Sequence, residues 1–258
     1  MLSFEGGGLE PDMKLRTLVR DALYLTWAVP SEALPEPPAP LRYQKHRFEE
    51  RDHSFVSAVV SRHEGLELPI LPRLHLSYSQ LNLFTYVLDG EGTPSVLVQH
   101  VWMPLWLTPG ARLMTGFPIS GASFECPQPS LDPTAEAWSW RVSGEGRLAL
   151  SAERGAPRLG PGPRFPSWDA LVEALRERET VYSLGAGRLH KVRVEVETKA
   201  VWPMKAEVEE ASLLSTPLSG MNGRWPPVYA AWLDAELPMI VELGRERQVA
   251  LSGVPAPG

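Results

Sequence analysis

The segment SQLNLFTYVL (residues 79–88) decides the fold class, because its side chains alternate between two kinds as they do in a β-strand. One face of such a strand is mainly apolar and carries Leu81, Leu83, Thr85 and Val87. The other face holds two amides and two aromatic rings, from Gln80, Asn82, Phe84 and Tyr86. This pattern is typical of a barrel wall with a packed core on one side and a polar cavity on the other. An ordinary solvent-exposed face that carries a few aromatics is the alternative.

Further strand-like segments, separated by turn signals, extend along the chain in both directions. They are expected near residues 41–47, 53–63, 73–88, 95–107, 111–116, 121–126, 136–143, 146–153, 188–200, 204–214 and 237–244. The stretch LHKVRVEVETKA (189–200) alternates most cleanly, with charged side chains on one face and valines on the other. We interpret its charged face as solvent-exposed and ion-paired.

Two segments favour helices. From Pro11 to Trp27 apolar residues recur at helical spacing, and this helix is expected to stop before Pro30. A second helix is expected over SWDALVEALRERETVYS, with Ser167 as its N-cap. Many strands and two helices predict an α+β fold, mainly antiparallel, with a barrel-like, strongly curved sheet and two main flanking helices. We expect one domain over residues 1–258, with 1–10 and 252–258 flexible.

Composition excludes several classes of protein. Apolar residues make up 43% and charged residues 22% of the chain, which is an ordinary globular mixture. The net charge of −6 argues against nucleic-acid binding. No apolar run approaches the roughly 18 residues of a membrane helix, so we expect a cytoplasmic protein without membrane contact. The 25 basic residues comprise twenty arginines and five lysines, so the chain has few side-chain amines.

Metal and nucleophile motifs are missing from the sequence. Cys126 is the one cysteine, which excludes an intramolecular disulfide and any multi-cysteine metal site. None of the six histidines forms an HxH, HxxH or HExxH pair, so we expect no metal and no cofactor. His100 lies in the strand-like stretch VLVQHVW with Val98 and Trp102 on the same face, which predicts partial burial.

Several stretches together resemble an uncharacterised bacterial family that is similar to acetoacetate decarboxylase in fold. The matching motifs are YLTWAVP (24–30), QLNLFTYV (80–87), ARLMTGFPISGA (111–122), ALRERETVY (174–182) and VWPMKAEV (201–208). The chain is a divergent member, since four positions depart from the family pattern: Gln80 replaces a glutamate, Phe84 an arginine, and Ile119 and Glu179 each a tyrosine.

The resemblance also implies a missing reactive group. Acetoacetate decarboxylase uses a lysine Schiff base, and its lysine pair follows a Gly-x-Pro sequence like Gly116–Pro118. Here the two following positions are Ile119 and Ser120, which cannot condense with a ketone. The resemblance implies that Gln80 occupies the position of a glutamate that assists the decarboxylase reaction. The side-chain amide of Gln80 cannot act as an acid or a base at neutral pH. We therefore expect no lysine Schiff-base chemistry.

Three functional hypotheses follow, and the first two involve a pocket with the candidate residues Gln80, Asn82, Tyr86, His100, Arg112, Gly116 and Pro118. The first is a barrel that binds a small organic carboxylate or ketone through polar contacts, with the Arg112 guanidinium as anion contact. An ion pair at the surface or barrel rim is an equally weighted reading of Arg112. The alternative is an enzyme of unrelated acid–base chemistry, using His100 or Tyr86. A structural role as a homo-oligomer is a third reading.

Overall fold

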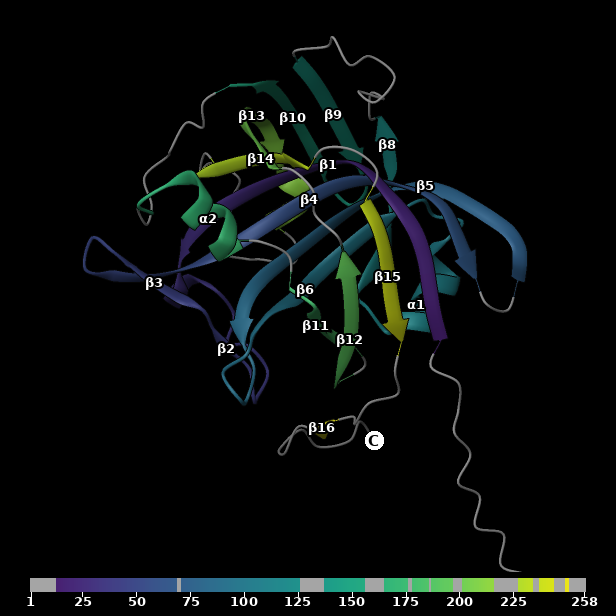
Figure 1. Ribbon diagram of the computed structural model, residues 1–258, viewed down its shortest axis with the longest axis horizontal. Coiled ribbons are helices and arrows are strands. Elements are labelled where there is room, and N and C mark those ends of the chain that lie inside the picture. Colours follow the sequence, from purple (N-terminus) through teal and green to yellow (C-terminus); the bar gives the residue numbers. More distant parts are fainter. Residues whose placement is uncertain are drawn as a thin grey trace, which may run out of the picture.

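Figure 1 shows the computed structural model of the chain, and the residues that it describes are 13–68, 71–125, 137–155, 165–175, 178–185, 187–196, 201–215, 227–233, 237–243 and 249–250. Within them the longest strands are β1 (Met13–Pro30), β4 (Arg51–Leu68) and β5 (Leu71–Leu88), with 18 residues each. Strand β6 (Pro94–Met103) follows β5 along the chain. The termini that were expected to be flexible, and Cys126, lie outside the described residues.

Seven strands close into a mixed barrel. Its order is β1, β4, β5, β6, β11 (Thr180–Gly185), β12 (Arg188–Val196), β15 (Leu237–Leu243) and back to β1. All neighbours are antiparallel except β6 and β11, which run parallel. The short strands β2 (Arg42–Tyr43), β3 (Lys45–Phe48), β7 (Ile119–Gly121) and β16 (Val249–Ala250) pair at its margins.

A second group of strands continues the sheet beyond the barrel, and most of it lies along the top of the view in Figure 1. These strands are β14 (Tyr229–Leu233), β13 (Val201–Ala211), β10 (Arg147–Arg154), β9 (Ala137–Ser143) and β8 (Ser123–Glu125). The sheet divides along β1, because Met13–Val19 pair with β15 and Ala22–Thr26 pair with β14. The division falls at Asp21, a non-glycine residue with a positive φ of 53° beside a bulge.

The division produces two hydrophobic cores on opposite faces of the same strands. One fills the barrel interior and includes Val19, Val59 and Val181. The other lies between the outer barrel face and the second group of strands. There Trp232 of β14 stacks on Trp138 of β9, with ring centroids 5.1 Å apart. The central parts of β1 and β4, residues 22–27 and 54–61, are therefore buried on both faces.

The helices are short. The α-helices among the described residues are α1 (Thr108–Thr115), α2 (Trp168–Leu175) and α3 (Ser212–Ser215), with a 3-10 turn at Ser31–Ala33. Leu171 and Leu175 of α2 belong to the barrel-interior core. No described helix has the length and apolar character needed to cross a membrane.

The predicted fold class is confirmed, but three local predictions are wrong. The predicted helix 11–27 is strand β1, in which bulges at Arg16/Leu18 and Arg20/Leu23 break the two-residue alternation. The predicted strand 111–116 belongs to helix α1, which has Pro109 in its first turn and ends at the left-handed Gly116. The predicted helix from Ser167 ends at Leu175, and its remainder enters β11. Strand β14 was not predicted.

Candidate functional site

A cavity of about 180 Å³ lies in the barrel interior. All seven barrel strands contribute to its wall, together with two residues from connecting segments, Phe117 and Arg178. Most of the lining is apolar, from Val19, Ala22, Tyr24, Val59, Phe84, Val96, Val98, Phe117, Val181, Val192, Val194, Val196, Met239 and Val241. An engineered apolar cavity of about 150 Å³ is large enough for benzene, so this one can hold a small ring or a short chain.

One side of the cavity is polar. It consists of Ser61 and His63 on β4 and of Gln80 and Asn82 on β5, and we call these four residues the polar wall. Alternation along each strand directs them to the same face, and register places Ser61 opposite Gln80. The Gln80 amide Nε2 donates to Asn82 Oδ1 at 2.6 Å, and the Ser61 hydroxyl is 3.3 Å from His63 Nε2.

His63 is held rigidly and without charge. Its ring stacks on Tyr78, with centroids 4.9 Å apart and an interplanar angle of 6°. Burial lowers the pKa of His63 to about 4, so the imidazole is neutral at pH 7. Its Nδ1 atom is shielded from solvent and has no hydrogen-bond partner among the described residues. A buried nitrogen of this kind carries a free-energy cost, because its interaction with water has been lost without replacement.

Arg178 is the one cationic side chain among the described lining residues. It follows α2, and its guanidinium Nη2 donates to the carbonyl oxygen of Ala174 at 2.9 Å. The cavity therefore combines a neutral polar wall, an apolar remainder and one guanidinium that already holds the end of α2.

The predicted candidate residues are distributed unevenly around this cavity. Gln80 and Asn82 line it. Tyr86 does not; its hydroxyl donates to the carbonyl oxygen of Leu175 at 2.9 Å and is 3.1 Å from the Ser57 hydroxyl, which ties β5 to α2.

His100 and Arg112 lie elsewhere. His100 pairs in register with Leu83, on the face of β6 that turns away from the cavity, and its ring packs on Trp102 at 4.5 Å. The expected face shared with Val98 is wrong, because the bulge beside Leu83 leaves Val98 facing the cavity. Burial lowers the pKa of His100, with opposing effects of Glu145 and Arg112. Arg112 is exposed on α1, and its Nε donates to the Ile119 carbonyl oxygen at 2.6 Å.

The Gly-x-Pro segment reaches the cavity through its middle residue. Gly116 ends α1 with a φ of 66°, and a β-carbon there would meet the His190 ring at 2.8 Å. The Pro118 carbonyl accepts a hydrogen bond from the Val101 amide at 2.9 Å, while the Phe117 ring between them lines the cavity. Ile119 is buried in the barrel-interior core.

A family model described as "Uncharacterized conserved protein", DUF2071, matches residues 17–229. The chain belongs to the DUF2071 family. This confirms the resemblance inferred from the five motifs, and the departures at Gln80, Phe84, Ile119 and Glu179 mark a divergent member. No curated protein matches the sequence significantly.

Several solved structures are similar to this chain in fold, at low sequence identity. The enduracididine biosynthesis enzyme MppR, complexed with a condensation product of pyruvate and imidazole 4-carboxaldehyde, matches with a TM-score of 0.62 at 13% identity, covering 93% of this chain and 90% of that one. An acetoacetate decarboxylase-like enzyme from Sphingomonas wittichii RW1 gives 0.57 at 13% identity, with coverages of 92% and 93%. An acetoacetate decarboxylase gives 0.58 at 11% identity, with coverages of 95% and 93%.

This DUF2071 member has no lysine among the described residues that line its cavity. Lys14, Lys45 and Lys205 form ion pairs with Glu242, Asp52 and Glu153, and Lys191 is exposed. Lys199 lies outside the described residues. The described residues also contain no group of histidine, cysteine or carboxylate side chains that could hold a metal ion.

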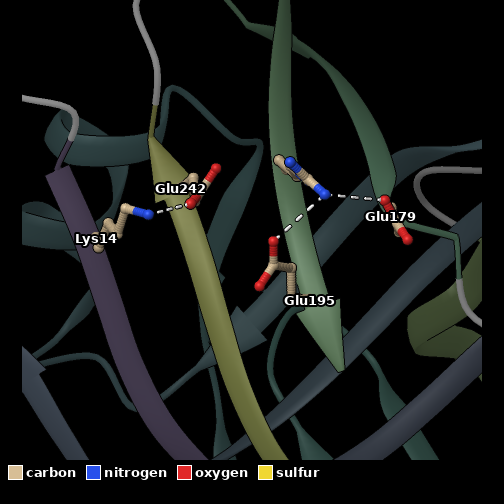
Figure 2. Close-up of polar contacts among 5 residues, drawn as sticks. Lys14, Glu179, Glu195 and Glu242 are labelled. Atoms are coloured by element: carbon tan, nitrogen blue, oxygen red, sulfur yellow. Dashed lines mark hydrogen bonds and ion pairs between the residues drawn. The ribbon is translucent and has the colours of Figure 1, made fainter. Parts of the chain in front are cut away.

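The outer face of β12 carries charges, as the alternation of residues 189–200 predicts. Arg193 contacts Glu179 at 3.3 Å and Glu195 at 3.4 Å, and Figure 2 shows these carboxylates beside the Lys14–Glu242 pair of the neighbouring strands. A hydrogen bond from Lys14 is the main reason that the pKa of Glu242 is lowered. The valines of the same strand, Val192, Val194 and Val196, line the cavity.

Sequence reasoning missed Ser61, His63 and Arg178. Strand β4 was expected, and its alternation puts Val59, Ser61 and His63 on one face, so a signal for two of these residues was present. The pairing of β4 with β5 determines which face of β4 turns towards the cavity. This register cannot be predicted from the sequence of β4 alone.

Proposed function

We propose that the barrel cavity binds a small organic carboxylate or ketone without forming a covalent bond. The observation that carries this proposal is the polar wall of Ser61, His63, Gln80 and Asn82. Apart from Arg178, the rest of the described lining is apolar, and it contains no amine. Cavities of this kind, mostly apolar with a few convergent polar groups, are the usual form of small-molecule sites.

Two further observations support the ligand class. The polar wall offers hydrogen-bond donors that suit carbonyl oxygens, from the amides of Gln80 and Asn82 and from the Ser61 hydroxyl. The neighbour MppR has been crystallised with pyruvate, which is a small keto acid. The alternative of acid–base catalysis by His100 or Tyr86 has weaker support, because neither residue is among those that line the cavity.

Binding can be tested with valine methyl groups as reporters. A protein labelled at its valine methyl groups is titrated with pyruvate, acetoacetate and cyclohexanone and followed by NMR. We expect shifts at the lining residues Val192 and Val194, and none at Val87 and Val142 in the outer core. Equal shifts at both sets, or none at either set, would contradict binding in the cavity.

Asn82→Leu is the variant that separates specific recognition from general hydrophobic binding. It removes an amide from the polar wall and is expected to weaken binding of the best of these probes by about tenfold. Ser183→Ala is the matched control, since Ser183 is fully buried in the same barrel but is not among the lining residues. Thermal unfolding of both variants checks that the fold is intact. A loss of affinity as large in Ser183→Ala as in Asn82→Leu would remove the support for a specific contact.

A further inference from the structure

The pair formed by Ser61 and His63 is the part of the polar wall whose hydrogen bonding the structure leaves incomplete. Ser61 is 4% exposed and His63 is 2% exposed. The two are joined by one hydrogen bond, between the Ser61 hydroxyl and His63 Nε2 at 3.3 Å. Each has further hydrogen-bonding capacity, since a hydroxyl both donates and accepts and a neutral imidazole has one donor and one acceptor nitrogen.

Two arrangements of protons are compatible with this contact. In the first, His63 Nε2–H donates to Ser61 Oγ, and the hydroxyl proton of Ser61 is left to point elsewhere. In the second, Ser61 donates to Nε2, and His63 carries its proton on Nδ1. The second arrangement buries an N–H donor that has no acceptor among the described residues, because Nδ1 is shielded and unpartnered.

Each arrangement leaves one donor without an acceptor among the described residues, either the Ser61 hydroxyl or the Nδ1–H of His63. The first arrangement is favoured because Ser61 lines the cavity, where a ligand or water can accept its proton, whereas Nδ1 is shielded. Burial also keeps the imidazole neutral, so the two nitrogens do not both carry protons. In the first arrangement the Ser61 hydroxyl, which belongs to the cavity wall, has a proton to donate. An oxygen acceptor inside the cavity would complete the network.

We propose that Ser61, positioned by His63, donates the hydrogen bond that selects a neutral carbonyl compound as the ligand of the cavity. This inference rests on the proposed function and narrows its ligand class. The polar wall around Ser61 is uncharged, and a carboxylate placed in an apolar cavity needs a paired cation to offset its lost hydration. Arg178, the cation of the described lining, uses its Nη2 to hold the Ala174 carbonyl at the end of α2, so an anionic ligand would have to be paired by its other N–H groups. The Arg178→Met variant below tests that pairing.

The proton arrangement is tested directly on the ligand-free protein. Long-range ¹H–¹⁵N correlation spectra at pH 7 distinguish a protonated Nε2 from a protonated Nδ1, with His63→Gln used to assign the signals. We expect the Nε2–H tautomer at His63. The Nδ1–H tautomer would overturn the inference, whether or not any ligand binds.

The ligand class is tested with two isosteric probes, cyclohexanone and methylenecyclohexane, which differ by a carbonyl oxygen in place of a methylene group. We expect wild-type protein to prefer the ketone. Ser61→Ala is expected to weaken cyclohexanone binding by about 3- to 10-fold and to change methylenecyclohexane binding less than twofold. Ser183→Ala, a buried serine outside the lining, should leave both affinities unchanged.

The positioning role of His63 has its own readout. His63→Phe keeps an aromatic ring to stack on Tyr78 but removes the Nε2–H donor, so it should lose the ketone preference while still binding the hydrocarbon. His63→Gln retains a side-chain N–H and should keep the preference. A purely structural role would lower the affinity for both probes together in both variants.

The possible failures are distinguishable. If wild-type protein binds neither probe and also fails to bind pyruvate and acetoacetate, the proposed function fails and this inference fails with it. If it binds pyruvate or acetoacetate but neither probe, the proposed function stands and the neutral ligand class is wrong. If both probes bind and Ser61→Ala does not change their ratio, the cavity is a binding site but Ser61 is not its selective donor. If cyclohexanecarboxylate binds more tightly than cyclohexanone and Arg178→Met abolishes that advantage, the ligand is an anion and the neutral class is wrong.

Discussion

Among single residues, His63 ties the chemistry of the cavity to the stability of the protein. Its pKa is about 4 in the folded state, against 6.5 for an unperturbed histidine. Between these two values the unfolded chain binds more protons than the folded one. The free energy of unfolding therefore falls as the pH drops from about 6.5 towards 4, and the contribution of His63 is constant above pH 7.

We expect His63 to account for a loss of about 3 kcal/mol between pH 7 and pH 4, from a pKa change of about 2.5. The measurement is urea unfolding at pH 7.5, 6, 5 and 4.5, for wild-type protein and for His63→Phe. His46 and His100 shift in the same direction and remain in both proteins, so the difference between the two curves isolates His63. Parallel curves would show that His63 is not buried in its neutral form.

At the level of elements, β1 shows what periodicity can and cannot reveal. Its sequence has apolar residues three and four positions apart, which is the spacing of a helix face. In the structure the segment is instead a strand with bulges, and it is buried on both faces from Ala22 to Trp27. Its apolar residues therefore do not alternate with polar ones. A strand that packs on a core at each side has no polar face to mark it. By contrast β5, which has a cavity on one side, was predicted correctly from its alternation.

Residues 111–116 were predicted to be a strand but belong to helix α1 and its C-cap, Gly116. Two glycines of this region, Gly110 and Gly116, provide a matched pair of substitutions. Gly116 has a φ of 66°, and a β-carbon on it would meet the His190 ring at 2.8 Å, whereas a β-carbon on Gly110 within the helix would meet nothing within 4 Å. Gly116→Ala should lower the free energy of unfolding by at least about 1–2 kcal/mol, because alanine resists the left-handed conformation.

Gly110→Ala should instead raise the free energy of unfolding by about 0.5–1 kcal/mol, because it reduces the conformational freedom of the unfolded chain without a clash. Chemical denaturation of the two variants measures both effects. Destabilisation of equal size at both positions would show that α1 is not the helix described, with its end at Gly116.

At the level of the whole molecule, the candidate site depends on information that no single segment contains. Gln80 and Asn82 could be predicted from one strand, because alternation places them on a distinct face. Ser61 and His63 become neighbours of these amides through the β4–β5 register, and Arg178 reaches the cavity from beyond α2. Closure of the barrel brings these parts together, and closure depends on the order of seven strands.

The whole molecule also determines which chemistry the barrel can perform. A Schiff base needs an amine inside the cavity, and no described lysine lines the cavity. Three of the described lysines, Lys14, Lys45 and Lys205, form ion pairs with carboxylates elsewhere in the molecule. Incubation of the folded protein with acetoacetate and borohydride should therefore give no stoichiometric mass increase. The same treatment of the urea-unfolded chain supplies the background labelling of its five lysines.

Peptide mapping makes this prediction sharper than intact mass alone. If one lysine were labelled in the folded protein well above its level in the unfolded chain, the barrel would contain a reactive amine, and non-covalent binding would no longer describe its function. Lys199, which lies outside the described residues, is the position at which such a result would be most informative. If no lysine is labelled more strongly in the folded protein than in the unfolded chain, the barrel has a cavity but no reactive amine in it. Decarboxylation through a Schiff base is then excluded for this family member.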